Sequence, residues 1–300
     1  MPNQNRDGRT PGSRVAFSSR EGEMIAVGKG VELFVRELGN PNGIATLWIH
    51  GGSVEDSSMM TRDLEPFFET LRVLIPDARG HGRSSRFESK DDYTWSAKCA
   101  DMIALLDVFG IERPIWGGNS MGAALSLWAG VHYPERVQAI IDISGPPAAT
   151  SDVEREWWAA HRPLVEARQF GRYYEANVIR RSGAAALEKL RARPERFAEI
   201  VAHLERHTIA SFLALLDETF DRPDWLESCA AIRCPTLVMG GAEDTFPDPE
   251  QTRAVAARIA HSTLYLVDGG PHFPNRTHRH EVQEVIRRFL EVVRTTESLE

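Results

Sequence analysis

Short runs of apolar residues recur along the chain, and most have the length and pattern of β-strands. Residues 31–35 alternate apolar and polar side chains, which is typical of a half-buried strand at a sheet edge. Residues 45–49 and 73–75 are continuous apolar runs, which are typical of buried parallel strands. The same reasoning predicts strands over residues 113–117, 137–143, 237–239 and 264–267.

Other segments carry apolar residues at helical spacing. Residues 91–109 predict a helix that ends at Gly110, with a stripe formed by Met102, Leu105, Leu106 and Val108. A second stripe near the C-terminus predicts a closing helix that packs on the sheet: Val282, Val285, Ile286, Phe289, Leu290 and Val293. Between Gly145 and about Trp225 the sequence is charged and helical, without clear strands. Strands that alternate with helices in this way predict a doubly wound α/β fold.

Length and charge exclude some classes of function. At 300 residues and 33.6 kDa, the chain can bury one large core and still carry an inserted helical lid. The net charge of −8 argues against a nucleic-acid partner, because no basic stripe is present to neutralise phosphates. No apolar run approaches the ~20 residues that a membrane helix needs. These features predict a globular protein without a nucleic-acid partner or a membrane helix.

The chain ends and the cysteines indicate the compartment. The polar N-terminus is unlike a secretory signal, and residues 1–19 are expected to form a loose tail. The three cysteines, Cys99, Cys229 and Cys234, are odd in number and irregularly spaced. They favour reduced thiols in a cytoplasmic protein over a disulfide framework.

The most informative motif is Gly118-Asn119-Ser120-Met121-Gly122, which has the form G-x-S-x-G. A predicted strand precedes it, and the apolar helical segment 123–131 follows it. A serine at such a strand-turn-helix corner is typical of a nucleophile elbow. The turn is tight, so glycines two residues to either side are needed to let strand and helix approach.

Four motifs in this order resemble the α/β-hydrolase superfamily from about Gly30 onward. The elbow is one, and the others are 47–53 (LWIHGGS), 77–84 (DARGHGRS) and 235–244 (PTLVMGGAED), the last followed by 269–274 (GGPHFP). The resemblance implies an α/β-hydrolase fold, with a mostly parallel, doubly wound sheet and a helical cap inserted after the sixth strand. Residues 20–145 and 226–300 would form the core, and residues 146–225 the cap.

The same resemblance implies a Ser-His-Asp triad. Ser120 would be the nucleophile, and His272, in the loop after the last strand, would be the general base. Asp244 is the expected acid because it fits the Gly-x-x-Asp spacing counted from Gly241. It would hold the histidine in the correct tautomer and stabilise the imidazolium.

Three other carboxylates remain alternatives for the acid. Glu243 and Asp248 would serve if the doubled glycine shifts the loop, and Asp142 lies near the end of the sixth predicted strand.

An oxyanion hole is expected from two backbone N–H groups. Met121, directly after the nucleophile, would supply one, and Gly52 in the His-Gly-Gly loop would supply the other. His50 and His81 are interpreted as structural residues of their turns.

Substrate contacts are harder to assign from sequence. Ser53, Asn119, Trp157 and Phe273 are the candidates, although cap aromatics serve equally well as lid core. Arginines and acids alternate through the cap, which is typical of solvated helix faces, although one or two of the arginines could meet an acidic substrate. The cap arginines are Arg162, Arg168, Arg172, Arg180, Arg181, Arg191, Arg193 and Arg196. His278 and His280 have no cluster of further ligands, so no metal is expected.

We therefore predict a cytoplasmic serine hydrolase that cleaves a small carboxylic ester or lactone through an acyl-enzyme, without a cofactor. One alternative is a C–C bond hydrolase of the meta-cleavage-product type. The segment Gly118-Asn119-Ser120-Met121-Gly122-Ala123 of this chain resembles the elbow of those enzymes. Against it, the chain lacks the longer Gly-rich oxyanion loop of those enzymes and has Phe273 where they have tryptophan. The second alternative is a small-molecule receptor on a hydrolase fold. The sequence leaves the substrate and the oligomeric state open.

Overall fold

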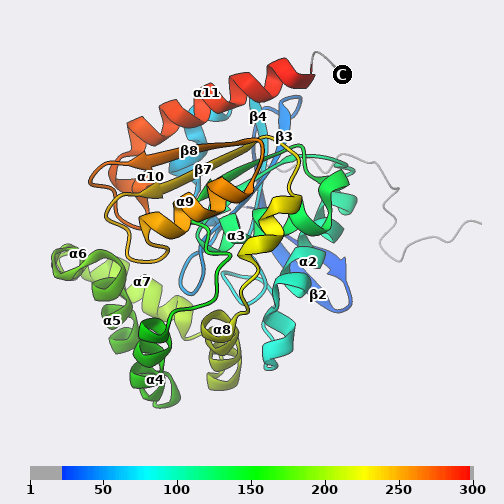
Figure 1. The fold of residues 1–300 in the computed structure, drawn as a ribbon. Helices are drawn as coiled ribbons and strands as arrows, with labels where there is room; N and C mark the ends of the chain where they lie inside the picture. The colour runs from blue at the N-terminus through cyan, green and yellow to red at the C-terminus, as the bar shows by residue number, and fades with distance from the viewer. Residues whose placement is uncertain (1–21, 298–300) are drawn as a thin grey trace, which may run out of the picture.

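A single eight-stranded sheet forms the centre of the computed structural model, which describes residues 22–297 (Figure 1). The strand order is β1-β2-β4-β3-β5-β6-β7-β8. Every neighbouring pair from β4 to β8 is parallel, whereas β2 is antiparallel to both β1 and β4. The predicted tail, 1–19, lies outside the described residues. The strands are β1 (Glu23–Gly28), β2 (Val31–Gly39), β3 (Ile44–Ile49), β4 (Leu71–Pro76), β5 (Ile115–Asn119), β6 (Ala139–Ile143), β7 (Thr236–Gly241) and β8 (Ser262–Val267).

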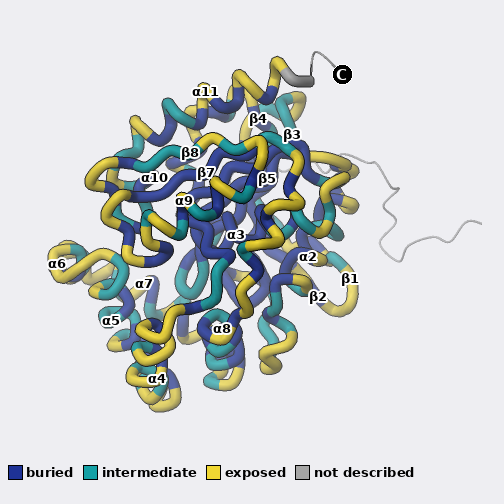
Figure 2. Tube along the Cα trace, viewed as in Figure 1, coloured by how far each residue is buried: buried dark blue, intermediate teal, exposed yellow. Residues whose placement is uncertain are grey.

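Helices cover both faces of the sheet, which explains the uninterrupted burial of its central strands. Helices α2, α3 and α9 pack on one face, and α1 and α11 pack on the other. Every residue of β5, β6 and β7 is buried, as expected for parallel strands between two helical layers (Figure 2). These helices are α1 (Thr61–Leu64), α2 (Trp95–Val108), α3 (Met121–His132), α9 (Pro249–Arg258), α10 (Pro274–Thr277) and α11 (Arg279–Glu297).

Five helices between β6 and β7 form a separate layer, which lies to one side of the sheet in Figure 1. They enclose an apolar cluster of their own, built largely from aromatic side chains of α4, α5 and α8. Their position after β6 matches the expected cap insertion. The cap helices are α4 (Asp152–Glu166), α5 (Phe170–Ser182), α6 (Ala184–Arg191), α7 (Pro194–Leu204) and α8 (Ile209–Asp221).

The predicted α/β-hydrolase architecture is confirmed, but three local features differ from the sequence expectation. The helix expected over 91–109 is divided into a 3₁₀ turn and α2, because Thr94 is extended (ψ 156°) and caps α2 by accepting a hydrogen bond from the Ala97 N–H. Strand β1 and helix α9 were not predicted. The 3₁₀ turns are η1 (Ser57–Met59), η2 (Glu65–Phe67), η3 (Lys90–Tyr93), η4 (Pro134–Arg136) and η5 (Leu226–Ala231).

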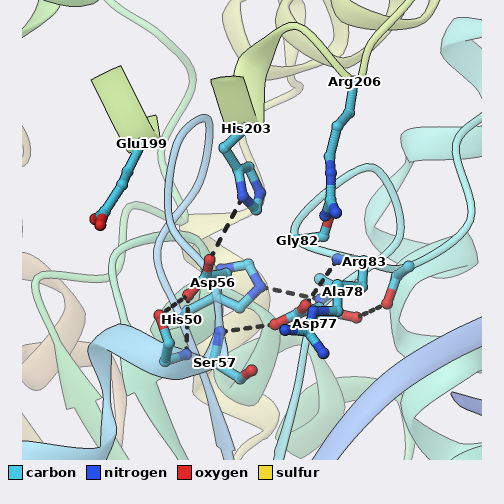
Figure 3. Close-up of polar contacts among 12 residues, drawn as sticks. His50, Asp56, Ser57, Asp77, Ala78, Gly82, Arg83, Glu199, His203 and Arg206 are labelled. Atoms are coloured by element: carbon cyan, nitrogen blue, oxygen red, sulfur yellow. Dashed lines mark hydrogen bonds and ion pairs between the residues drawn. The ribbon is translucent and has the colours of Figure 1, made fainter. Parts of the chain in front are cut away.

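Polar contacts join the end of α7 to two loops of the core (Figure 3). His203 Nδ1 lies 3.7 Å from Asp56 Oδ2, and Arg206 donates a hydrogen bond of 3.3 Å to the Gly82 carbonyl oxygen. Burial lowers the pKa of His203, which disfavours the charged imidazolium and weakens the contact with Asp56. The polar contacts that attach the cap here are therefore weak.

Two further observations concern the described residues as a whole. All three cysteines carry free thiols, in agreement with the expectation from their number and spacing. Between residues 22 and 297, no helix has both the length and the apolar character that a membrane span requires.

Candidate active site

Ser120 lies at the corner between β5 and α3, in a strained backbone conformation. Its φ is 52° and its ψ is −111°, which places a non-glycine residue in a left-handed region. A Cβ atom on Gly118 would lie 2.4 Å from the Ile49 carbonyl oxygen, and one on Gly122 would lie 2.1 Å from the same atom. Both positions therefore require glycine. This geometry is the elbow that the G-x-S-x-G motif predicts.

His272 lies in the loop after β8 and is bonded to Asp244 in the loop after β7. His272 Nδ1 is 2.9 Å from Asp244 Oδ2, and the two side chains are only 2% and 1% exposed. The other carboxylate oxygen, Oδ1, accepts a hydrogen bond of 2.8 Å from the Phe246 N–H. A carboxylate can only accept, so Nδ1 carries the proton and Nε2 carries a lone pair, which lies 3.5 Å from Arg181 Nη1. Nε2 is the atom that a general base would use.

The surroundings of His272 favour the neutral imidazole. Burial lowers its pKa, and the Arg181 guanidinium lowers it further, against the opposing charge of Asp244. Ser120 and His272 line the same cavity between the sheet and the cap. The fold thus brings the predicted nucleophile and base to the same cavity, although they are 152 positions apart in the sequence.

The three alternative acids lie elsewhere. Glu243 is exposed at the surface, and Asp248 caps the N-terminus of α9 by accepting the Gln251 N–H at 2.8 Å. Asp142 accepts the Gly145 N–H at 2.8 Å, and burial raises its pKa to about 8. None of the three is the carboxylate bonded to the histidine.

The two residues expected to form the oxyanion hole also line the cavity. A Cβ atom built on Gly52 would lie 3.6 Å from Met121 Cβ, so the loop after β3 and the start of α3 are adjacent. The loop is held by Glu55, whose Oε2 accepts the Gly51 N–H at 2.9 Å and whose Oε1 accepts from Arg276 at 2.5 Å. This buried carboxylate was not identified from the sequence.

His50 and His81 serve the backbone of their turns. His50 Nε2 accepts the Ala78 N–H at 3.0 Å (Figure 3). Its Nδ1 therefore donates to the Gly51 carbonyl oxygen at 2.6 Å. His81 Nδ1 lies 3.0 Å from the Arg79 carbonyl oxygen, and burial lowers its pKa well below the usual value. The structural interpretation of both histidines agrees with these bonds.

The four predicted substrate contacts divide into two pairs. Ser53 and Phe273 line the cavity. Asn119 is fully buried and does not line the cavity. Neither its side-chain oxygen nor its side-chain nitrogen has a hydrogen-bond partner in the described chain. Trp157 packs within the cap, with Arg180 4.2 Å above its ring, and is not part of the cavity lining.

Several polar residues of the cavity wall carry no motif. Arg181 is one of the cap arginines that the sequence offers for an acidic substrate, whereas the others were not assigned to the site from the sequence: Glu55, Lys98, Asn177, Glu218 and Arg222. A signal does exist for four of them. Asn177 and Arg181 are four residues apart at the end of α5, and Glu218 and Arg222 are four apart at the end of α8. Residues at this spacing share a helix face, but the sequence alone does not tell which face meets the cavity.

No metal site is evident in the part of the chain that the structure describes. Between residues 22 and 297, no group of three or more His, Cys, Asp or Glu side chains is arranged to hold an ion. His278 Nδ1 instead lies 3.0 Å from the hydroxyl of Thr277.

Comparisons with known proteins agree with this geometry. The family model for the alpha/beta hydrolase fold matches residues 47–278. The chain is 27% identical over 236 residues to 3-oxoadipate enol-lactonase 2 of Acinetobacter baylyi, an alignment that covers 77% of this chain and 85% of that protein.

Two solved structures share the fold. The enol-lactonase from Burkholderia xenovorans LB400 has a TM-score of 0.75 and 24% identity, over 89% of this chain and 99% of that one. A thermophilic esterase from Thermogutta terrifontis, determined with malate bound, has a TM-score of 0.67 and 24% identity, over 88% of this chain and 94% of that one.

Proposed function

The chain belongs to the α/β-hydrolase fold family, and we propose that it is a serine hydrolase that cleaves a small carboxylic ester or lactone through an acyl-enzyme. The observation that carries this proposal is the buried bond of 2.9 Å between His272 Nδ1 and Asp244 Oδ2, beside a cavity that Ser120 also lines. A serine needs such an oriented base in order to act as a nucleophile.

In the first step, Ser120 Oγ attacks the carbonyl carbon of the substrate while His272 Nε2 takes the hydroxyl proton. Negative charge then develops on the former carbonyl oxygen. In this proposal the N–H groups of Gly52 and Met121 stabilise it, and one donor of this kind is worth about 3–4 kcal/mol in the transition state of related enzymes. Asp244 stabilises the imidazolium that forms and does not itself take up the proton.

The tetrahedral intermediate collapses when the C–O bond of the leaving alcohol breaks. His272 returns its proton to that oxygen, and the acyl group stays on Ser120. Water then attacks the acyl carbon with His272 again as base, which releases the carboxylic acid and restores the serine hydroxyl. With a lactone, the leaving hydroxyl remains part of the acyl group, and the final product is a hydroxy acid.

The names of similar proteins support this class of substrate. The matched relative from Acinetobacter baylyi is named as an enol-lactonase, and one structural neighbour is described as an esterase. C–C bond cleavage would require donors for both a carboxylate and an enol oxygen, for which the sequence offers Asn119 and the cap arginines. Asn119 is fully buried outside the cavity lining, so this donor is absent from the cavity, and hydrolysis of an ester or lactone does not need it.

A substrate panel tests the proposal. We expect kcat/KM for 4-nitrophenyl butyrate or a small lactone to exceed that for any meta-cleavage dienoate at least tenfold, which is about 1.4 kcal/mol in the barrier. An enzyme that bleaches the dienoate faster than it releases nitrophenol would overturn the proposal in favour of C–C hydrolysis. Tight ligand retention with negligible turnover would favour the receptor.

A further inference from the structure

Two arginines of the cap line the cavity that Ser120 and His272 also line. Arg181 belongs to the last turn of α5, and Arg222 directly follows α8. Arg222 is only 5% exposed. It donates to the carbonyl oxygens of Ala148 and Thr219, both at 3.1 Å, while its Nη2 atom is buried without a hydrogen-bond partner among residues 22–297. A buried donor without a partner raises the free energy of the folded protein, so an acceptor from outside the chain would be favourable at this nitrogen.

The charges around these two arginines do not balance. The other charged side chains near this wall are paired with one another: Lys98 with Glu218 at 2.9 Å, Glu55 with Arg276 at 2.5 Å, and Arg180 with Glu154 at 2.6 Å. Neither Arg181 nor Arg222 has a carboxylate within ion-pair distance in the described chain. The carboxylate of Asp244 is the remaining negative charge beside these two positive guanidiniums. The cavity therefore carries an excess of about one positive charge, which suits a monoanion better than a dianion.

Burial makes the charged form of both guanidiniums less favourable. Burial lowers the pKa of Arg181 to about 9, with the positive charge of Arg180 adding to the effect. Burial likewise lowers the pKa of Arg222 to about 10. A bound anion would offset the loss of hydration at both guanidiniums, and their planar forks match a carboxylate.

The position of Arg181 links this wall to the reacting atoms. Its Nη1 atom lies 3.5 Å from His272 Nε2 and donates a hydrogen bond of 3.3 Å to the Phe246 carbonyl oxygen. Both arginines also lie 4.7 Å above the ring of Phe246, which holds the two guanidiniums near one side chain. An anionic group bound here would share one cavity with Ser120, the residue that attacks the carbonyl carbon in the proposed function.

We propose that Arg181 and Arg222 form a subsite for a carboxylate of the substrate, so that the preferred substrate is an ester or lactone whose acyl chain is short and ends in a free carboxylate. This inference rests on the proposed ester or lactone hydrolysis and specifies its substrate. Asn177, one turn before Arg181 on the same face of α5, lies beside the subsite as a further amide donor.

A matched pair of substrates tests the subsite. Mono-4-nitrophenyl glutarate carries the terminal carboxylate, and 4-nitrophenyl pentanoate has the same chain length without it. We expect the wild-type kcat/KM to favour the anionic ester by about 10-fold to 100-fold, the range for charge-assisted hydrogen bonds. Arg181→Gln and Arg222→Gln should remove most of this preference, mainly through KM. Arg191→Gln, at an exposed arginine of α6 that does not line the cavity, is the control and should keep it.

A second measurement needs no variant, and so remains valid if Arg222→Gln does not fold. Glutaramate, a monoanion at pH 7, should inhibit wild-type hydrolysis of 4-nitrophenyl pentanoate competitively, at concentrations at least tenfold lower than neutral glutaramide. Equal inhibition by the two compounds would overturn the subsite, as would an Arg181→Gln variant that loses activity equally on both esters. Tighter inhibition by inorganic phosphate than by glutaramate would also overturn it.

The failures of the subsite and of the proposed function are distinguishable. Calorimetric titration of Ser120→Ala with glutaramate measures the subsite without any chemistry. Glutaramate binding in a protein that hydrolyses no ester would support the subsite and overturn the hydrolase. Ester hydrolysis through Ser120 with no preference for the anionic ester would do the reverse.

Discussion

The cavity has two walls that are built on different principles. On the sheet side, Ser120, Asp244 and His272 sit on loops at the strand ends, and backbone contacts fix them. Glycines at 118 and 122 leave no room even for a methyl group. On the cap side, long side chains such as Arg181 and Arg222 project from helix ends. They are held by hydrogen bonds to carbonyl oxygens and by contact with Phe246.

This difference separates the chemistry from the choice of substrate. The sheet wall places atoms with the precision that proton transfer and oxyanion stabilisation require, because a backbone in a packed core has little freedom. The cap wall determines which substrate charge and shape are accepted. A helix-end side chain can change there without disturbing the sheet. We therefore expect changes to the sheet wall to abolish turnover and changes to the cap wall to alter selectivity.

The largest expected effect is that of Ser120→Ala. In the proposed mechanism the serine makes the covalent bond, so kcat for 4-nitrophenyl butyrate should fall by about 10⁴-fold to 10⁶-fold, as in other triads. Steady-state kinetics with a matched circular dichroism spectrum would check both activity and folding. A folded variant that keeps more than about one percent of the rate would show that another group is the nucleophile.

Asp244→Asn should come next. An asparagine favours the wrong tautomer of His272, and the expected loss in kcat is about 10⁴-fold. The control is Asp142→Asn, at a second buried aspartate whose pKa is already raised to about 8, so that an uncharged side chain is tolerated there. Kinetics of the two variants at pH 7 compare the positions directly. If Asp142→Asn were the more damaging of the two in kcat, the acid would have to be reassigned.

The two walls also differ in how far the sequence reveals them. The G-x-S-x-G motif predicts the elbow because close approach of strand and helix demands glycine at 118 and 122, a constraint visible in sequence. His272 and Asp244 follow from their positions after predicted strands. Arg222 carries no such constraint, since its role depends on where α8 ends relative to the sheet. Tertiary packing of the cap decides that, and local sequence does not.

Similar reasons account for the other differences. Asn119 is adjacent to Ser120 in sequence, but it is fully buried and does not line the cavity. Trp157 was a candidate substrate contact because large aromatics line many pockets, yet the cap needs such side chains for its own core. Glu55 was missed because its role is to hold the backbone of a loop, which no residue pattern records.

A glycine-to-alanine comparison tests the rigidity of the two walls. Gly122→Ala would place a Cβ atom 2.1 Å from the Ile49 carbonyl oxygen, and we expect a loss of at least about 1–3 kcal/mol in the free energy of unfolding. Gly171→Ala in α5 would bring Cβ no closer than 3.5 Å to its neighbours, and helix propensity predicts no loss and a gain of up to about 1 kcal/mol. Urea denaturation measures both. Equal destabilisation by the two substitutions would contradict the expectation that the sheet side is packed more tightly than the cap.

The pH dependence of kcat/KM tests how the cap acts on the base. Burial and Arg181 both lower the pKa of His272, so the acid limb with a neutral ester should lie below the ordinary value of 6.5. Removing the positive charge with Arg181→Gln makes the imidazolium easier to form, which raises this pKa and moves the limb to higher pH. A limb that stays in place or moves to lower pH in the variant would contradict the contact between Arg181 and the base.

The smallest effect is expected at the contact between α7 and the core. His203→Gln removes a weak, partly exposed interaction with Asp56, and the free energy of unfolding should change by less than about 1 kcal/mol. Turnover of 4-nitrophenyl butyrate should stay within twofold of wild type. A tenfold loss in kcat would mean that cap attachment, and not only the cavity wall, controls the chemistry.

Covalent labelling tests the central claim most directly. A fluorophosphonate reacts with a serine hydroxyl only where a base and an oxyanion hole activate it. Intact-protein and peptide mass spectrometry should show one label per chain, on the peptide that contains Ser120, with loss of ester hydrolysis in proportion to labelling. The Ser120→Ala variant should take up none. Hydrolysis that continues at full rate after complete labelling, or a label on any other residue, would contradict the account.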